Sequence, residues 1–441
     1  MAMETVANTG GRIFYVSEKG NDERDGLTPE SAWRTSKRVS ADAGEIVYGD
    51  IVLFERDGIY RGSTKLISGV TYGAYGQGEK PCLYGSLRNY AEESFWEATS
   101  TEHIWKLNVG TMKDIGNLVF DHGKAWAMKR LEMMLSEDFD FWHDQEGQAL
   151  YLYLSAGNPG CVYEDIEVCS NDHIMWGPTQ YMKDILIENL CLKYTGAHGI
   201  CFSHGSKNIT VRNCEIGYIG GSMLDETVRY GNGFEVVDGC CDILVENNWV
   251  YQCYDAGITH QSSFQPGCVQ ENIVFRGNLI EYCNYNIEYY VSEEHGIIKN
   301  TVYEDNVLRY AGYGFGSVNR IGSDTSVLSH ICCYVRNMPC ENFVIRNNVL
   351  DTSLRYLTTI GCTNDEEGLG PVMTGNRYIQ RCRPEKETEL ARIWDPEKGE
   401  KVAIIVNSQV EMEEAVKKLD ATPEVIVLYE AHELEGKYET V

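Results

Sequence analysis

Residues 242–250 read DILVENNWV, an apolar strand followed by a turn with two asparagines. Six further segments, at spacings of 24 to 42 residues, share the pattern: DILIENLCL (184–192), NITVRNCEI (208–216), NIVFRGNLI (272–280), NTVYEDNVL (300–308), NFVIRNNVL (342–350) and the weaker GPVMTGNRY (370–378). Such internal similarity indicates a solenoid, in which each repeat packs on the next. Because no segment has a helical period, the repeat predicts an all-β fold, a right-handed single-stranded parallel β-helix.

Each coil carries a second strand after the turn. These strands read HGICF (198–202), NGFEV (232–236), AGITH (256–260), YNIEY (285–289) and YGFGS (313–317). One turn position is predicted to form a ladder of hydrogen-bonded amides, preceded by Leu190 and Cys214: Asn248, Asn278, Asn306, Asn348 and Asn376. Another column is predicted to lie in the core at a bend: Thr195, Ile219, Cys253, Cys283 and Ala311.

The rhythm of the coils divides the chain into four parts. Residues 1–90 hold short Gly-punctuated strands and are predicted to form the first coils, and residues 161–383 form the central β-helix. Residues 91–160 break the rhythm and are rich in Trp, Phe and Met, which predicts an inserted β-rich subdomain. From residue 384 the pattern changes to strand, helix and strand, as expected of a C-terminal cap over the open end of the solenoid.

Composition narrows the classes of partner. The formal charge of −28 argues against nucleic acid and anionic membranes as ligands. No stretch approaches the roughly 18 apolar residues of a spanning helix, and the first residues lack an apolar signal core. We therefore expect a soluble, cytoplasmic protein with no membrane partner. The sixteen cysteines include no C-x-x-C pair, so they are expected to be reduced thiols, with Cys253 and Cys283 in the core.

The outward face of the second strands carries the candidate chemistry. Successive residues of a strand point to opposite faces. In each second strand, the residue after the inward-pointing apolar residue therefore points outward, and these residues form an outward column: Cys201, Glu235, Thr259, Glu288 and Gly316. Coils stack ~4.8 Å apart, which places Glu235 and Glu288 about 10 Å apart at the backbone. Paired carboxylates cleave glycosides as general acid and as nucleophile or base. Long insertions at 218–232, 260–271, 290–299 and 319–341 are expected to wall this column.

Other residues near the column are candidates of less specific pattern. Asp255 is a possible third catalytic carboxylate, although an Asp that caps a bend is equally ordinary there. The expected substrate contacts are, besides Thr259, the side chains of His260, Tyr289, Glu293 and Arg320. For His260, and for one of the tyrosines at 289 and 290, a structural position in the core is the alternative interpretation. The acidic loop at 293–294 is a candidate calcium-binding loop, and no other metal or cofactor is expected.

The stretch 184–380 resembles the single-chain β-helix carbohydrate-active enzymes of gut and soil bacteria. These include pectate-lyase-like proteins and the β-helix glycoside hydrolases of the xylosidase and fucosidase type. The resemblance rests most closely on NGFEVVDGCCDILVENNWVYQCYDAGITHQS (232–262), NIEYY (286–290) and AGYGFGSVNR (311–320). It implies a carbohydrate substrate and two carboxylates on outward strand positions of neighbouring coils. Glu235 and Glu288 match that placement with one coil between them.

Three function classes therefore remain open. A glycoside hydrolase would use the Glu235 and Glu288 pair on an oligo- or polysaccharide. A polysaccharide lyase would need a base and a cation beside a uronate, for which Lys299 and Arg320 are the candidates. A non-catalytic carbohydrate-binding solenoid would have an aromatic surface without paired acids. The sugar, its linkage, the stereochemical outcome and the oligomeric state are not encoded in these patterns.

Overall fold

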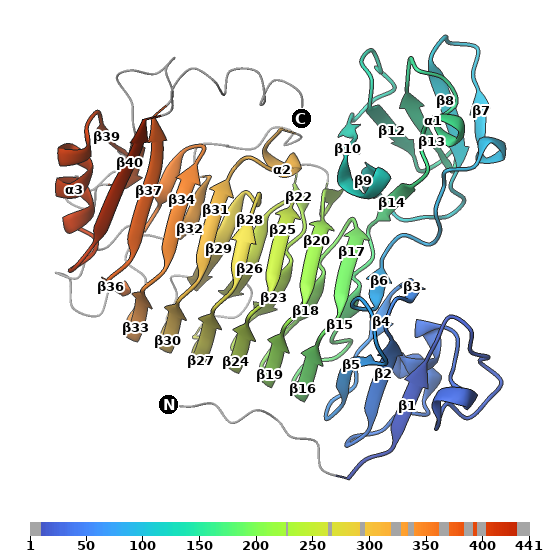
Figure 1. Ribbon diagram of the computed structural model, residues 1–441, viewed down its shortest axis with the longest axis horizontal. Coiled ribbons are helices and arrows are strands. Elements are labelled where there is room, and N and C mark those ends of the chain that lie inside the picture. The colour runs from blue at the N-terminus through green and yellow to red at the C-terminus, as the bar shows by residue number, and fades with distance from the viewer. Residues whose placement is uncertain are drawn as a thin grey trace.

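The computed structural model describes residues 10–225, 228–262, 267–291, 296–318, 328–333, 339–360, 370–382, 391–394 and 403–429. Three ten-stranded sheets run side by side along a solenoid (Figure 1). The first sheet contains, in spatial order, β1 (Ile13–Val16), β2 (Ile51–Glu55), β5 (Thr71–Tyr75), β16 (Lys183–Glu188), β19 (Lys207–Arg212), β24 (Cys241–Glu246), β27 (Val269–Arg276), β30 (Ile297–Glu304), β33 (Cys340–Arg346) and β36 (Val372–Thr374). Its strands pair in parallel with the corresponding strands of the coils above and below.

The second sheet repeats this arrangement, and so does the third except at its end, where β38 and β39 pair antiparallel. The second contains β3 (Ile59–Arg61), β6 (Cys82–Tyr84), β17 (Cys191–Thr195), β20 (Glu215–Ile219), β25 (Trp249–Cys253), β28 (Leu279–Glu281), β31 (Val307–Ala311), β34 (Val349–Ser353), β37 (Arg377–Cys382) and β40 (Glu424–Tyr429). The third contains β4 (Thr64–Lys65), β15 (Met175–Trp176), β18 (Ile200–Phe202), β23 (Phe234–Val237), β26 (Ala256–Ser262), β29 (Tyr285–Val291), β32 (Ser329–Cys332), β35 (Tyr356–Thr358), β38 (Ala391–Trp394) and β39 (Ala403–Val406). The fold is a parallel β-helix, as the repeat predicts.

Each full coil has three strands rather than the two expected from the sequence. The chain bends at the residue before the ladder position, where φ is positive, as at Asn189 (59°), Asn247 (55°) and Gly277 (63°). Asn and Gly adopt this left-handed conformation more readily than other residues. The apolar residues after the bend therefore start a separate strand, which the sequence pattern alone had merged with the first.

The amide ladder is confirmed. Asn248 donates to Asn278 (3.0 Å), and the same side-chain bond joins Asn278 to Asn306, Asn306 to Asn348 and Asn348 to Asn376, each at 2.9 Å. The ladder ends at buried Asp420, whose carboxylate accepts from the Asn376 amide (2.8 Å). The bend column is also confirmed, because all five of its residues are fully buried.

We expect Asn306→Ala to lower the free energy of unfolding by about 3 kcal/mol, since buried polar partners are left without hydrogen bonds. The Asn306 side chain donates to the Phe275 carbonyl (2.8 Å) and to Asn348, and accepts from the backbone and side-chain N–H groups of Asn278. Urea denaturation measures the change. Asn108→Ala, at the exposed end of a strand, is the control and should shift the midpoint little.

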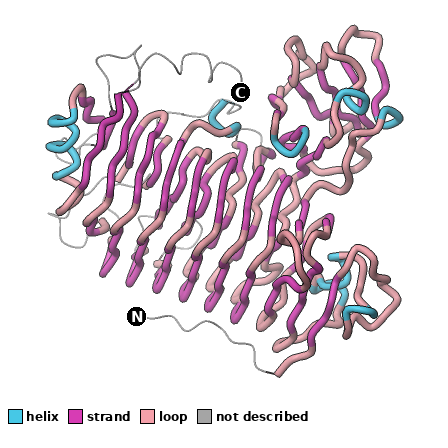
Figure 2. The backbone as a smooth tube through the Cα atoms, in the orientation of Figure 1, coloured by secondary structure: helices cyan, strands magenta, loops and turns pink. Residues whose placement is uncertain are grey.

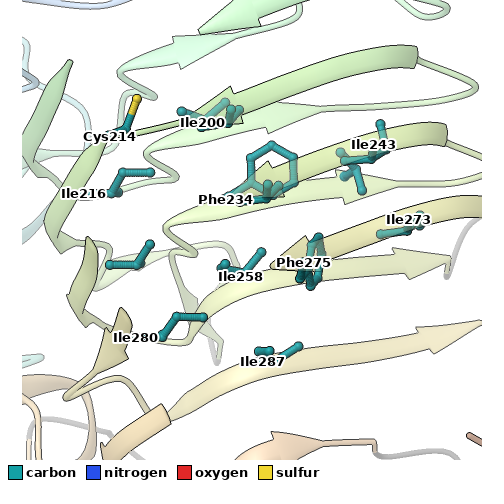
Figure 3. Close-up of a cluster of buried hydrophobic side chains, with 14 of the residues drawn as sticks. Ile200, Cys214, Ile216, Phe234, Ile243, Ile258, Ile273, Phe275, Ile280 and Ile287 are labelled. Carbon is teal, nitrogen blue, oxygen red and sulfur yellow. The ribbon is translucent and has the colours of Figure 1, made fainter. Parts of the chain in front are cut away.

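The core runs along the axis in columns of like residues (Figure 3). Ile200, Phe234, Ile258 and Ile287 form one such column on the third sheet, where consecutive strands pair residue by residue. Each of these side chains is fully buried. The strand expected at YGFGS (313–317) is wrong, because Phe315–Val318 forms the short helix α2. Phe315 therefore does not join this column, and Gly316 does not join the outward column. Ile331 and Cys332 of β32 take their places.

A separate subdomain lies between β6 and β15 (Figure 1). One sheet contains β7 (Trp96–Ala98), β8 (Ile104–Asn108), β11 (Met128–Lys129), β12 (Asp140–Asp144) and β13 (Ala149–Tyr153), and a second contains β9 (Ile115–Phe120), β10 (Ala125–Trp126) and β14 (Ile166–Ser170). It has its own apolar core. Arg61 of the solenoid binds Glu167 of β14 through two 2.8 Å hydrogen bonds.

Helices are few and short (Figure 2). They are η1 (Pro29–Ser31), η2 (Ser36–Val39), η3 (Ala41–Ala43), η4 (Glu93–Phe95), η5 (Asp121–Gly123), α1 (Pro159–Val162), α2 and α3 (Gln409–Lys417). Helix α3 lies between β39 and β40 at the C-terminal end and buries Met412, Ala415 and Val416. Among the residues described, none of these helices has the length and apolar character needed to cross a membrane.

Candidate functional site

The outer face of the third sheet presents one column of side chains. Strand pairing places these residues in register on consecutive coils: Trp176, Cys201, Glu235, Thr259, Glu288 and Cys332. The structure therefore places Glu235 and Glu288 in the same column, with Thr259 between them, as the alternation of strand residues implied. Their surroundings differ, and those differences determine the chemistry that each can perform.

Glu235 is held at the edge of solvent by two neighbours that the sequence reasoning missed. Its side chain is 14% exposed, and its Oε2 lies 3.1 Å from Nε2 of His198. The Asn232 amide donates to the same oxygen (2.5 Å). Asn232 is itself oriented, because its Oδ1 accepts from the backbone N–H of Ala256 (2.8 Å). Both of these contacts fall on Oε2, so Oε1 is the oxygen that can face a ligand.

The tautomer of His198 follows from its hydrogen bonds. Its Nδ1 accepts from the backbone N–H of Asn232 (3.0 Å), so in the neutral ring the proton is on Nε2, the nitrogen that lies 3.1 Å from Glu235 Oε2. Burial lowers the pKa of His198 to about 4, although the charge of Asp255 opposes the shift. A neutral imidazole therefore faces Glu235 at neutral pH, and it adds no positive charge that would keep the glutamate ionised.

Burial raises the pKa of Glu235 to about 7. The hydrogen bond from Asn232 opposes this shift, and the negative charges of Asp255 and Asp238 add to it. A carboxylic acid that keeps its proton near neutral pH is the form needed to protonate a leaving group. Among the carboxylates that we expected to be catalytic, Glu235 has the environment of a general acid.

Rings pack around His198, the neighbour of this acid. His173 stacks on His198, with ring centroids 5.2 Å apart and planes 6° apart. Tyr230 meets the His198 ring edge-on at 4.9 Å. Trp176, two strands from Glu235 in the column, lies tilted against His173. The sequence signal for this cluster was present, because His198 and Asn232 begin the segments HGICF and NGFEV at the bend before the outward strand.

Asp255 is half-buried in the bend of the next coil, where its backbone N–H donates to the Gly231 carbonyl (3.1 Å). The next residue, Ala256, donates its backbone N–H to Asn232, which holds Glu235. The negative charge of Asp255 favours the protonated forms of Glu235 and His198. Glu288 is more enclosed, at 3% exposure. Its Oε2 accepts from Thr259 Oγ1 (3.2 Å) and from the Gln261 amide (2.7 Å). Of the three expected catalytic carboxylates, Asp255 is thus the one whose charge raises the pKa of Glu235.

His260 and Tyr289 do not lie where we expected substrate contacts. Both point into the core, with exposures of 0% and 1%. Nδ1 of His260 lies 2.5 Å from Gln270 Oε1, and its Nε2 is hydrogen-bonded to the Tyr303 hydroxyl. The expectation of sugar contact is corrected for both, because residues next to the outward column alternate inward. Thr259 faces outward but is fully buried, and its hydroxyl donates to Glu288.

Two expected substrate contacts, Glu293 and Arg320, lie outside the described residues. Lys299, the candidate base of a lyase, lies on β30 of the first sheet and pairs with Glu341 (3.0 Å). It is therefore on a different sheet from Glu235. In the described part of the chain, no group of three or more His, Cys, Asp or Glu side chains is arranged to hold a metal ion.

The chain was compared with known proteins. No protein-family model matches it, and no curated protein is significantly similar in sequence. Among solved structures it is similar to XylC in complex with xylose, with 11% identity over 94% of this chain and 82% of that chain (TM-score 0.44). It is also similar to the GH136 lacto-N-biosidase from Eubacterium ramulus (12%, 95% and 68%, 0.42) and to pectate lyase Pel9A (12%, 85% and 77%, 0.40). At this level of identity these similarities assign no reaction or substrate to the chain.

Proposed function

We propose that the protein is a glycoside hydrolase that acts on an oligo- or polysaccharide, with Glu235 as the proton donor. The observation that carries this proposal is the raised pKa of Glu235, about 7, at a side chain that still reaches solvent. Structural carboxylates on a sheet surface are usually ionised and paired with cations. Here a neutral histidine and an amide hold the acid instead, which suits a group that gives up its proton during each turnover.

The second carboxylate is proposed to be Asp255. Cleavage of a glycoside needs an ionised carboxylate across the scissile bond from the acid, as a nucleophile or as a base for water. Burial is the main cause of the raised pKa of Glu235, and the negative charge of Asp255 adds to it, which favours the acid role for Glu235. Glu288, held by Thr259 and Gln261 two coils away in the register, is proposed to bind the substrate or to support the column.

The reaction class is tested with purified protein and a panel of aryl glycosides and plant or bacterial polysaccharides. A hydrolase releases a reducing sugar or the aryl group without a new chromophore in the glycan. A lyase would instead leave an unsaturated uronate that absorbs in the near ultraviolet, and that result would overturn the proposal. The location of Lys299 on another sheet supports the hydrolase assignment over the lyase.

The rate should fall as the pH rises through about 7, because Glu235 acts in its protonated form. Its folded-state pKa lies above the ordinary value of a glutamate, so the active form persists to neutral pH and is lost above it. The alkaline limb of kcat/KM against pH, measured on an aryl glycoside, gives this midpoint. A limb with its midpoint above pH 9 would show that another group is the proton donor.

A further inference from the structure

A two-stranded hairpin connects the inserted subdomain to the candidate site. It consists of β21 (Ser222–Met223) and β22 (Arg229–Tyr230), and it precedes the strand that carries Glu235. At its base the chain crosses itself closely: a Cβ added to Gly231 would lie 2.1 Å from Cα of Gly220. Only residues without a side chain allow this approach, so the two ends of the hairpin lie in contact where it leaves the solenoid.

Tyr230 is the hairpin residue that meets the site. Its ring packs edge-on against His198, and its hydroxyl donates to Asn171 Oδ1 (2.5 Å). The Asn171 amide donates in turn to the Met223 carbonyl (3.2 Å) on the other strand of the hairpin. Burial is the largest cause of the raised pKa of Tyr230, and the negative charge of Glu235 adds to it. Tyr230 therefore packs on the His198 side of the site, where it is also bonded to Asn171 of the subdomain.

Arg229 attaches the hairpin to both the inserted subdomain and the solenoid. It is 4% exposed. Its Nε donates to the Gly221 carbonyl (2.6 Å), and one terminal nitrogen donates to the Gly116 carbonyl of subdomain strand β9 (3.0 Å). Its guanidinium also lies 4.4 Å from the ring centroid of Tyr254 in the solenoid. A buried arginine with donors in two directions fixes the relative position of the groups that accept from it.

Asp114 of the subdomain holds the same hairpin from its other strand. Its Oδ2 accepts from the backbone N–H of Met223 (2.7 Å), and its carbonyl accepts from the Ser222 hydroxyl (3.0 Å). Both carboxylate oxygens also accept from the ammonium of Lys129, at 2.5 Å each. Lys129 is 4% exposed, so this ion pair is shielded from water and salt.

We propose that the inserted subdomain is a positioning element, in which Asp114 and Lys129 fix hairpin β21–β22 so that Tyr230 excludes water from His198 and Glu235. This inference rests on the proposed role of Glu235 as proton donor. Burial is the largest cause of the raised pKa of Glu235, so the cover over it sets the pH at which the acid works. The subdomain contributes no catalytic residue in this arrangement. It contributes the dry surroundings that the acid needs.

Titratable side chains from several coils face Glu235. They are Cys201, His198 and Tyr230, and the carboxylates Asp238 and Asp255. None of these bears a positive charge at neutral pH, since burial lowers the pKa of His198 to about 4. If Tyr230 no longer covered Glu235, water would reach the carboxyl group and lower its pKa. None of the groups named above would add a positive charge that lowers this pKa further.

The test measures the titration of the Glu235 carboxyl by infrared difference spectroscopy, with Glu235→Gln as the subtraction reference. We expect Tyr230→Ala and Asp114→Asn each to lower the midpoint by about one pH unit or more. Glu167→Gln is the matched control, because it also neutralises a buried carboxylate that anchors the subdomain, and it should leave the midpoint unchanged. If Asp114→Asn does not fold, Lys129→Gln tests the same pair.

Hydrogen exchange of residues 220–236 is the second readout. Asp114→Asn should speed exchange in the hairpin by tenfold or more, and Glu167→Gln should not. A midpoint unchanged in Tyr230→Ala, or a wild-type exchange rate in Asp114→Asn, would overturn the proposal. The infrared titration needs no substrate, so it is independent of the hydrolase assay. A shifted midpoint without any glycosidase activity would remove the proposed function and leave the positioning role in place.

Discussion

Glu235→Gln should lower kcat/KM on an alkyl or unactivated glycoside by about 10²–10⁴-fold, the range that general acid catalysis contributes. Gln retains the shape of the side chain and can still accept from Asn232, so the fold around the bend should persist. The lost group is the proton for the departing oxygen. The measurement is the rate for a series of aryl glycosides whose leaving groups differ in acidity.

The series makes the expectation specific to an acid. A leaving group as acidic as dinitrophenol departs without protonation, so Glu235→Gln should approach the wild-type rate on that substrate while remaining slow on poor leaving groups. Glu246→Gln, on the first sheet of the same coil region, is the control and should behave as wild type. A uniform loss across all leaving groups would show that Glu235 acts in substrate binding or folding, not as the proton donor.

Asp255→Asn should produce a second loss of comparable size, about 10²–10⁴-fold or more, because no ionised carboxylate would then face the anomeric carbon. The same substitution removes a negative charge that raises the pKa of Glu235. The alkaline limb of the pH profile should therefore move to lower pH, in addition to the fall in rate. The measurement is the full pH profile of kcat/KM on the most reactive aryl glycoside.

Glu288→Gln separates the two candidate partners of Glu235. It lies two strands from Glu235 in the register, with Thr259 between them, so the alkaline limb should stay in place. An amide can still accept from Thr259, and we expect a smaller loss, of about tenfold or less. Added azide should restore turnover only in the variant that has lost the nucleophile of a retaining enzyme. Azide rescue in Glu288→Gln and not in Asp255→Asn would reverse the assignment.

The local pattern of the sequence was sufficient for the solenoid. An Asn at the same turn position of five coils can satisfy its amide only by bonding to the neighbouring coils, so the pattern itself implies stacking. Alternation along each outward strand likewise placed Glu235 and Glu288 on one face, and it pointed His260 and Tyr289 inward. The expectation of sugar contacts from those two residues rested on their polar side chains and not on their inward positions in the alternation.

The third strand of each coil was missed for a physical reason. A left-handed residue such as Asn247 bends the chain within an unbroken apolar pattern, and hydrophobic periodicity does not register a bend of one residue. The replacement of Gly316 by Cys332 in the outward column has a similar origin. YGFGS matched the strand pattern, but Phe315–Val318 is helical, and the chain returns to the column only at β32.

By itself, the sequence determined the fold class, the stacking of coils and the column that holds Glu235, because each depends on residues that recur at fixed positions along the chain. Only the tertiary structure showed how the surroundings of the candidate carboxylates differ, and our proposal of Glu235 as the proton donor depends on that difference. The pKa of Glu235 depends on burial, on Asn232 and on Asp255 of the next coil, and the hairpin that covers it is held by Asp114 from an inserted subdomain. The burial that raises the pKa of Glu235 depends on side chains from several segments that pack together, so no single segment of the sequence predicts it.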